Sequence, residues 1–151
     1  MWQIRQMIAL AVLAICAYTD IKERNIYIFP LCISSAGAVM ITIISYIFSQ
    51  DGGKGRILFE ELVLPMAVGV LLIVAAKTKA AHVGMGDAYL LAALGLIIGI
   101  RPDIITAAAA LTMVAVYALY MMISGRRRRF MRIPFAPFVM TGFMMVLINE
   151  I

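Results

Sequence analysis

Two aspartates stand where carboxyl groups could do chemistry in this chain, Asp20 and Asp87. Asp20 ends the first apolar run of the sequence, and Asp87 follows the glycines Gly84 and Gly86 and precedes another apolar run. If the two carboxyl groups lie a few ångström apart, they cannot both ionise, so the pair shares one proton. The ionised member can then take a proton from water while the protonated member activates a carbonyl group. Such a pair hydrolyses peptide bonds without a metal ion or a nucleophilic side chain.

Each aspartate also has a simpler structural interpretation. Aspartate is a preferred helix N-cap, so Asp87 could merely cap the helix that follows it. Gly84 and Gly86 would then form a turn, because glycine tolerates unusual backbone angles and close approaches. Asp20 begins a polar cluster over residues 20–25, which is typical of a solvated anchor at the end of a membrane span. Catalysis therefore depends on whether the two carboxyl groups meet.

The sequence gives little support for other arrangements of reactive or metal-binding side chains. His82 is the only histidine, and it has neither a second histidine nor an adjacent cysteine, so a metal site or a Cys-His or Ser-His pair is disfavoured. Cys16 and Cys32 lie in separate apolar runs and form no C-x-x-C pair that would indicate zinc. The basic residues are few and sit at the ends of apolar runs, which disfavours nucleic acid as a partner. We expect no metal and no cofactor.

The elements that must position the two aspartates are membrane helices. Of the 151 residues, 64% are hydrophobic, well above the roughly 45–50% of soluble domains. The N-terminus lacks the pattern of a cleavable signal peptide, so we expect the first apolar run to be a retained span. Since a span needs about 20 apolar residues, somewhat fewer with snorkelling flanks, we predict one all-α, polytopic domain over residues 1–151. Its six expected transmembrane helices cover residues 4–19, 27–48, 62–76, 88–100, 104–123 and 134–148.

The distribution of lysine and arginine predicts the orientation of these spans. Six spans put both termini on one side of the membrane, and the basic residues then divide nine to four between the two sides. The positive-inside rule makes the nine-residue side cytoplasmic and both termini extracytoplasmic. Asp20 and Asp87 then lie at the same depth, at the cytoplasmic ends of the first and fourth spans. The nine are Lys22, Arg24, Lys77, Lys79, Arg126, Arg127, Arg128, Arg129 and Arg132; the four are Arg5, Lys54, Arg56 and Arg101.

Three segments of the chain resemble a known family. Residues 84–91, which begin Gly84-Met85-Gly86-Asp87, resemble the GxGD signature of the type IV prepilin peptidases, a family of intramembrane aspartyl proteases. Residues 20–26 resemble that family's first aspartate motif, and residues 133–138 resemble its proline-rich opening of the last span. The motifs occur in the family's order and span nearly the whole chain. The chain differs at Tyr27, where the family often has proline, and at Tyr89, where it often has lysine.

The resemblance implies that Asp20 and Asp87 are the catalytic pair. Gly84 and Gly86 would let the segment that carries Asp87 approach Asp20 and the substrate backbone. The implied reaction is removal of a short basic leader from pilin-like (Flp or preflagellin-like) precursors, at the cytoplasmic face of the inner or plasma membrane. The 151 residues contain no counterpart of the cytoplasmic domain of longer members, which carries paired C-x-x-C motifs and accompanies methylation, so the resemblance implies the protease alone.

The same two aspartates are also compatible with a function other than catalysis. Carboxylates within a membrane also mark the paths of ions and protons. Asp20 and Asp87 could instead bind a cation or carry protons in a non-enzymatic membrane subunit or a small transporter.

Overall fold

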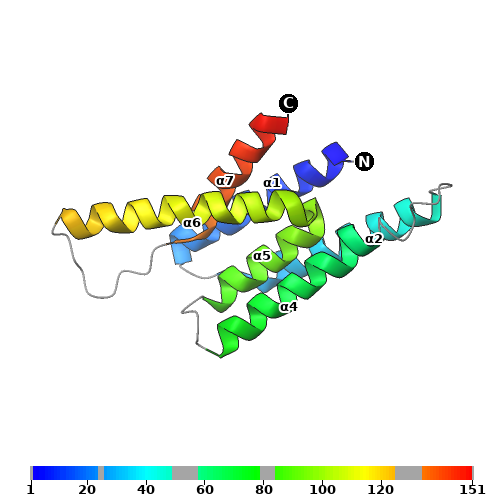
Figure 1. Cartoon of the computed structure of the whole chain (residues 1–151), viewed down its shortest axis with the longest axis horizontal. Coiled ribbons are helices and arrows are strands. Elements are labelled where there is room, and N and C mark those ends of the chain that lie inside the picture. The colour runs from blue at the N-terminus through cyan, green and yellow to red at the C-terminus, as the bar shows by residue number, and fades with distance from the viewer. Residues whose placement is uncertain (1, 24–25, 49–57, 79–83, 125–133, 151) are drawn as a thin grey trace.

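A computed structural model describes residues 2–23, 26–48, 58–78, 84–124 and 134–150, and these residues are helical, without a strand (Figure 1). The prediction of an all-α chain is confirmed. The predicted loop at 49–57, most of the connector after residue 77, His82 and the arginines at 126–129 lie outside the described residues. The helices of the described part are α1 (Trp2–Glu23), α2 (Ile28–Phe48), the π-helical turn η1 (Phe59–Val63), α4 (Leu64–Lys77), α5 (Met85–Ile98), α6 (Ile100–Ile123) and α7 (Ala136–Glu150).

Most of these helices are membrane helices by length and composition. Among the described residues, four segments are long and apolar enough to cross a bilayer: Gln3–Glu23, Ile28–Phe48, Phe59–Lys77 and Ile100–Ile123. The helices α5 and α7 are apolar but shorter. Each of the six apolar runs is therefore helical, as expected of a multi-pass membrane protein.

The short helix α5 is the centre of the bundle. It packs against α1, α2, α4 and α6, and its buried side chains include Leu90, Leu94, Ile97 and Ile98. Successive helices alternate in direction, so both termini lie at one end of the bundle (Figure 1). The end of α1 and the starts of α5 and α7 lie at the opposite end. The fold thus gathers the ends of these three helices.

Two glycines allow the close helix contacts that hold this arrangement. A Cβ added to Gly69 of α4 would lie 2.9 Å from the Cβ of Ala92 in α5. A Cβ added to Gly142 of α7 would lie 2.8 Å from the carbonyl oxygen of Thr106 in α6. Small residues let helix backbones approach closely in lipid, where no hydrophobic effect drives helices together. These two contacts fix α5 against α4, and α7 against α6.

The predicted break between the fourth and fifth spans is wrong. Residues 101–103 were expected to separate the fourth and fifth apolar runs, but they lie in the first turn of α6. The chain turns instead at Gly99, whose φ of 83° is readily adopted only by glycine. Pro102 is tolerated in the first turn of a helix, where its missing N–H costs no hydrogen bond. Asp103 consequently lies inside the protein and is only 4% exposed.

Candidate active site

Asp20 lies inside α1 rather than beyond it. The sequence placed the end of the first span at residue 19, but the helix continues through Asp20 to Glu23. The carboxyl group is buried, and its Oδ2 accepts a hydrogen bond of 3.0 Å from the backbone N–H of Ala136, the first residue of α7. The first N–H groups of a helix have no partner within the helix and carry partial positive charge, so they favour a carboxylate. The proline-rich opening of the last apolar run thereby reaches the first aspartate.

Asp87 is the third residue of α5. The N-cap of this helix is Gly84, with φ −65° and ψ 139°, so the expectation that Asp87 is itself the N-cap is wrong. The half-buried carboxyl group turns back instead and accepts a hydrogen bond from the backbone N–H of Gly84. Acidic side chains at this position commonly satisfy the N-cap N–H in this way. Because Oδ2 would lie 2.9 Å from a Cβ at Gly84, this arrangement depends on the absence of a side chain there.

The structure brings the two aspartate motifs together. Ile26, which lies between α1 and α2 in the chain, is buried against α5. A Cβ added to Gly86 would lie only 3.2 Å from the Cβ of Ile26. The helices α1 and α5 are in contact, and the charge of Asp20 acts on the carboxyl group of Asp87. Both carboxyl groups therefore lie at the same end of two packed helices, in a region that we call the polar centre.

This centre has the composition needed for acid–base chemistry. It joins two carboxyl groups and two backbone N–H donors, from Ala136 and Gly84. In the part of the chain that the structure describes, no cluster of three or more His, Cys, Asp or Glu side chains could hold a metal ion. A carboxyl pair can take a proton from water and donate one to a carbonyl oxygen, and those two transfers begin the hydrolysis of a peptide bond.

Comparison with known proteins agrees with the motifs. The chain matches the model of the type IV leader peptidase family over residues 7–119, a stretch that contains Asp20, Gly84, Gly86 and Asp87. It belongs to the type IV leader peptidase family. The resemblance inferred from the motifs is confirmed, and the chain is a membrane protein of a protease family. No curated protein and no solved structure matches the chain significantly.

The leader peptidase match ends within α6, yet α7 also contributes to the centre. The N–H of Ala136 that binds Asp20 lies beyond the matched residues. The sequence signal for this contribution is the proline-rich segment before α7, which was noted as a motif but not as a hydrogen-bond donor. Tyr27, which stands where the family often has proline, donates a hydrogen bond from its hydroxyl group to the carboxylate of Glu23 at the end of α1.

Sequence reasoning missed a second polar cluster in this leader peptidase, at the end of the bundle near the N-terminus. Arg5 of α1 is 6% exposed and forms an ion pair of 2.7 Å, through Nη1, with Oε2 of Glu61 in η1. Its Nη2 donates to the hydroxyl group of Thr42 in α2. From the sequence, Arg5 was expected only to contribute to the charge difference between the two sides of the membrane. The available signal was a charged residue in the first turn of an apolar run, since charged residues within membrane helices generally find a partner.

Proposed function

We propose that this chain is an intramembrane aspartyl endopeptidase that removes the basic leader from type IV pilin-like precursors, with Asp20 and Asp87 as its catalytic pair. The observation that supports the proposal is the packing of the first aspartate motif, through Ile26, against Gly86 of the second motif, within a member of the type IV leader peptidase family. Like-charged carboxyl groups held together share a proton, and one of them then acts as a base while the other acts as an acid.

The hydrolysis needs only this proton and a water molecule. The ionised carboxylate takes a proton from water as the water oxygen bonds to the scissile carbonyl carbon, and the protonated carboxyl group gives its proton to the carbonyl oxygen. The resulting tetrahedral diol collapses when its carbon–nitrogen bond breaks. One hydroxyl group of the diol gives its proton to the ionised carboxylate, and the leaving nitrogen takes a proton from the protonated carboxyl group, so the pair again holds one proton. The N–H of Ala136 donates to the carboxyl group of Asp20, and the N–H of Gly84 donates to that of Asp87. The acceptor positions that remain on the two carboxyl groups can bind water and substrate. We assign neither aspartate to one role, because the titration belongs to the pair.

The proposed topology has six spans, with both termini extracytoplasmic and the active site at the cytoplasmic face of the inner or plasma membrane. The excess of lysine and arginine on one side supports it. The 14 residues of α5 cover about 21 Å at roughly 1.5 Å per residue, less than the hydrocarbon core of about 30 Å. At least one end of α5 is therefore expected to lie below the membrane surface, or the bilayer to thin around it. A reporter fused after Arg129 should be cytoplasmic, and an external reporter would overturn this orientation.

Cleavage of a pilin-like precursor by the wild type, Asp20→Asn and Asp87→Asn in the same membranes tests the mechanism. Each variant removes one carboxyl group, so we expect each to lower the rate at least about 1,000-fold, a scale typical of lost acid–base groups. The matched control is Asp103→Asn, which changes another aspartate in the first turn of a helix and should cleave at the wild-type rate. Wild-type cleavage by Asp20→Asn or Asp87→Asn would overturn the shared-proton mechanism. Proton flux through the wild type without cleavage would favour the transporter instead.

A further inference from the structure

The last turn of α1 separates its charged side chains between two sides of the helix. Glu23 follows Asp20 by three residues, so it lies about 60° around the axis from Asp20 and about 4.5 Å farther along it. Residues with this spacing are neighbours on a helix surface. Lys22 lies about 160° around the axis from Asp20, and its ammonium group is 5.8 Å from the centroid of the Tyr18 ring. The side of α1 that carries Asp20 therefore ends in an acidic residue.

Tyr27 fixes the position of the Glu23 carboxylate. Its hydroxyl group donates a hydrogen bond to Oε2 of Glu23, and both side chains are exposed. This hydrogen bond and, as a smaller cause, the negative charge of Glu23 raise the pKa of Tyr27, so the phenol keeps its proton at neutral pH. A proline, which the family often has at this place, could not donate such a bond. Because the Tyr27 hydroxyl is neutral, it leaves the negative charge of Glu23 in place.

Glu23 and Tyr27 lie beside the polar centre. Ile26, the residue before Tyr27, is buried, and a Cβ added to Gly86 would lie 3.2 Å from its Cβ. Gly86 immediately precedes Asp87, so the residues that follow Glu23 pack on the second aspartate motif. The carboxylate of Glu23 is therefore an exposed negative charge next to the proposed catalytic pair.

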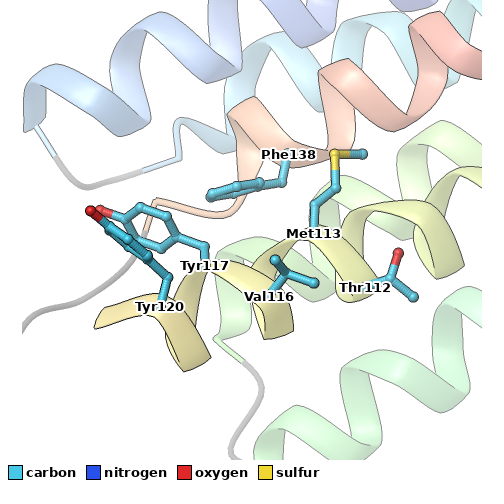
Figure 2. A pocket seen from close by; sticks show the side chains of 6 residues that line it. All are labelled: Thr112, Met113, Val116, Tyr117, Tyr120 and Phe138. Carbon is cyan, nitrogen blue, oxygen red and sulfur yellow. The ribbon is translucent and has the colours of Figure 1, made fainter. Parts of the chain in front are cut away.

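A negative charge is rare on this side of the protein. Under the proposed topology, Glu23 is the one acidic residue on the cytoplasmic side besides Asp20 and Asp87, whereas nine lysines and arginines lie there. Such an excess of positive charge repels a basic segment, which would therefore need a carboxylate close to the site. The apolar groove between α6 and α7 cannot supply one, because its lining, which includes Tyr117 and Phe138, is uncharged (Figure 2).

We propose that Glu23, positioned by Tyr27, binds a basic side chain of the precursor's leader next to the polar centre. This inference rests on the proposed function, which supplies the basic leader. The leader of a precursor bound for cleavage adjoins the scissile bond, and Glu23 is the exposed acidic neighbour of Asp20. An exposed ion pair changes affinity by up to about fivefold. Glu23 thus favours basic leaders and takes no part in the proton transfers.

Changing the charge of Glu23 and of the leader together tests this assignment. The substrates are a pilin-like precursor and the same precursor with the leader's lysines and arginines replaced by glutamine, both in phosphatidylcholine vesicles at low ionic strength. The measured quantity is the KM for the neutral leader divided by the KM for the basic leader. We expect this ratio to fall about threefold in Glu23→Gln and about twofold in Tyr27→Phe. About 0.5 M salt should remove both differences.

Two matched controls separate a local contact from net charge. Lys22→Gln removes the neighbouring charge on the opposite side of α1 and should keep the wild-type ratio. Tyr18→Phe removes an exposed hydroxyl group from the same helix and should also keep it. A rise of the ratio in Lys22→Gln that equals its fall in Glu23→Gln would overturn the assignment, because the leader would then respond only to net charge.

Other outcomes distinguish the leader contact from the proposed function. The same ratio in the wild type and Glu23→Gln would overturn the contact and leave the peptidase intact. Anionic lipid also attracts basic segments. A dependence on leader charge that appears only in vesicles with phosphatidylglycerol, and equally in both enzymes, would place the leader on lipid and overturn the contact as well. A wild type that cleaves neither precursor would overturn the proposed function together with this inference.

Discussion

Replacing Gly84 with alanine tests whether the position of the Asp87 carboxyl group controls cleavage. The new Cβ would lie 2.9 Å from Oδ2 of Asp87. Unforced carbon–oxygen contacts lie at about 3.3–3.6 Å, so the carboxyl group must move by about 0.5 Å. A misplacement of about 1 Å costs about 100-fold in rate, so we expect kcat/KM to fall about tenfold, mainly through kcat. The φ of −65° at Gly84 is open to alanine, so the backbone is not strained.

The assay compares precursor cleavage in vesicles with thermal unfolding of the same protein. Alanine is a poorer N-cap than glycine, so the free energy of unfolding should fall by about 1 kcal/mol or less, too little to explain the lost rate. The matched control is Gly37→Ala in α2, where nothing lies within 4 Å of the added Cβ. Gly37→Ala should keep full activity and gain about 0.5–1 kcal/mol, since alanine favours a helix interior. Wild-type kcat/KM in Gly84→Ala would refute the reasoning.

Three further substitutions test the packing that supports the site. Arg5→Met leaves the partly exposed Glu61 without its partner and should lower the free energy of unfolding by about 1–3 kcal/mol; an unchanged melting temperature would contradict this. Gly142→Ala sets a Cβ 2.8 Å from the Thr106 carbonyl oxygen, which cannot move aside, so we expect a loss of about 1–3 kcal/mol and a lower melting temperature. Asp103→Asn should change stability by less than about 1 kcal/mol, because the buried Oδ1 has no hydrogen-bond partner to lose; a large drop would reveal one.

Local sequence predicted the helices because a bilayer requires long apolar segments, and each apolar run is helical in the structure. Exact boundaries were less predictable. Asp20 and Arg101 interrupt apolar runs, so both were placed outside spans, but backbone hydrogen bonds continue through polar residues. The real breaks are set by backbone geometry, as at Gly99, which adopts φ 83°. Hydropathy thus located the helices, and a single glycine marked an end that hydropathy misplaced.

The candidate site, like the helix boundaries, could be predicted only in part from the sequence. Residue types and spacing singled out Asp20 and Asp87, and the family match covers both. The donors that hold their carboxyl groups were not visible, because the N–H groups of Gly84 and Ala136 are backbone atoms whose availability depends on where α5 and α7 begin. The pattern of side-chain types in the sequence therefore does not reveal these backbone donors.

The sequence by itself determined the membrane class of this protein, its helices and the residue types able to hydrolyse a peptide bond. The tertiary structure alone decided how each helix is rotated about its axis, and hence which partners meet. Runs that are apolar on every side have no preferred face, so their composition cannot specify rotation. Close contacts such as Gly86 against Ile26 specify it instead. Rotation is the reason that Asp20 meets the start of α7, and that Arg5 reaches Glu61.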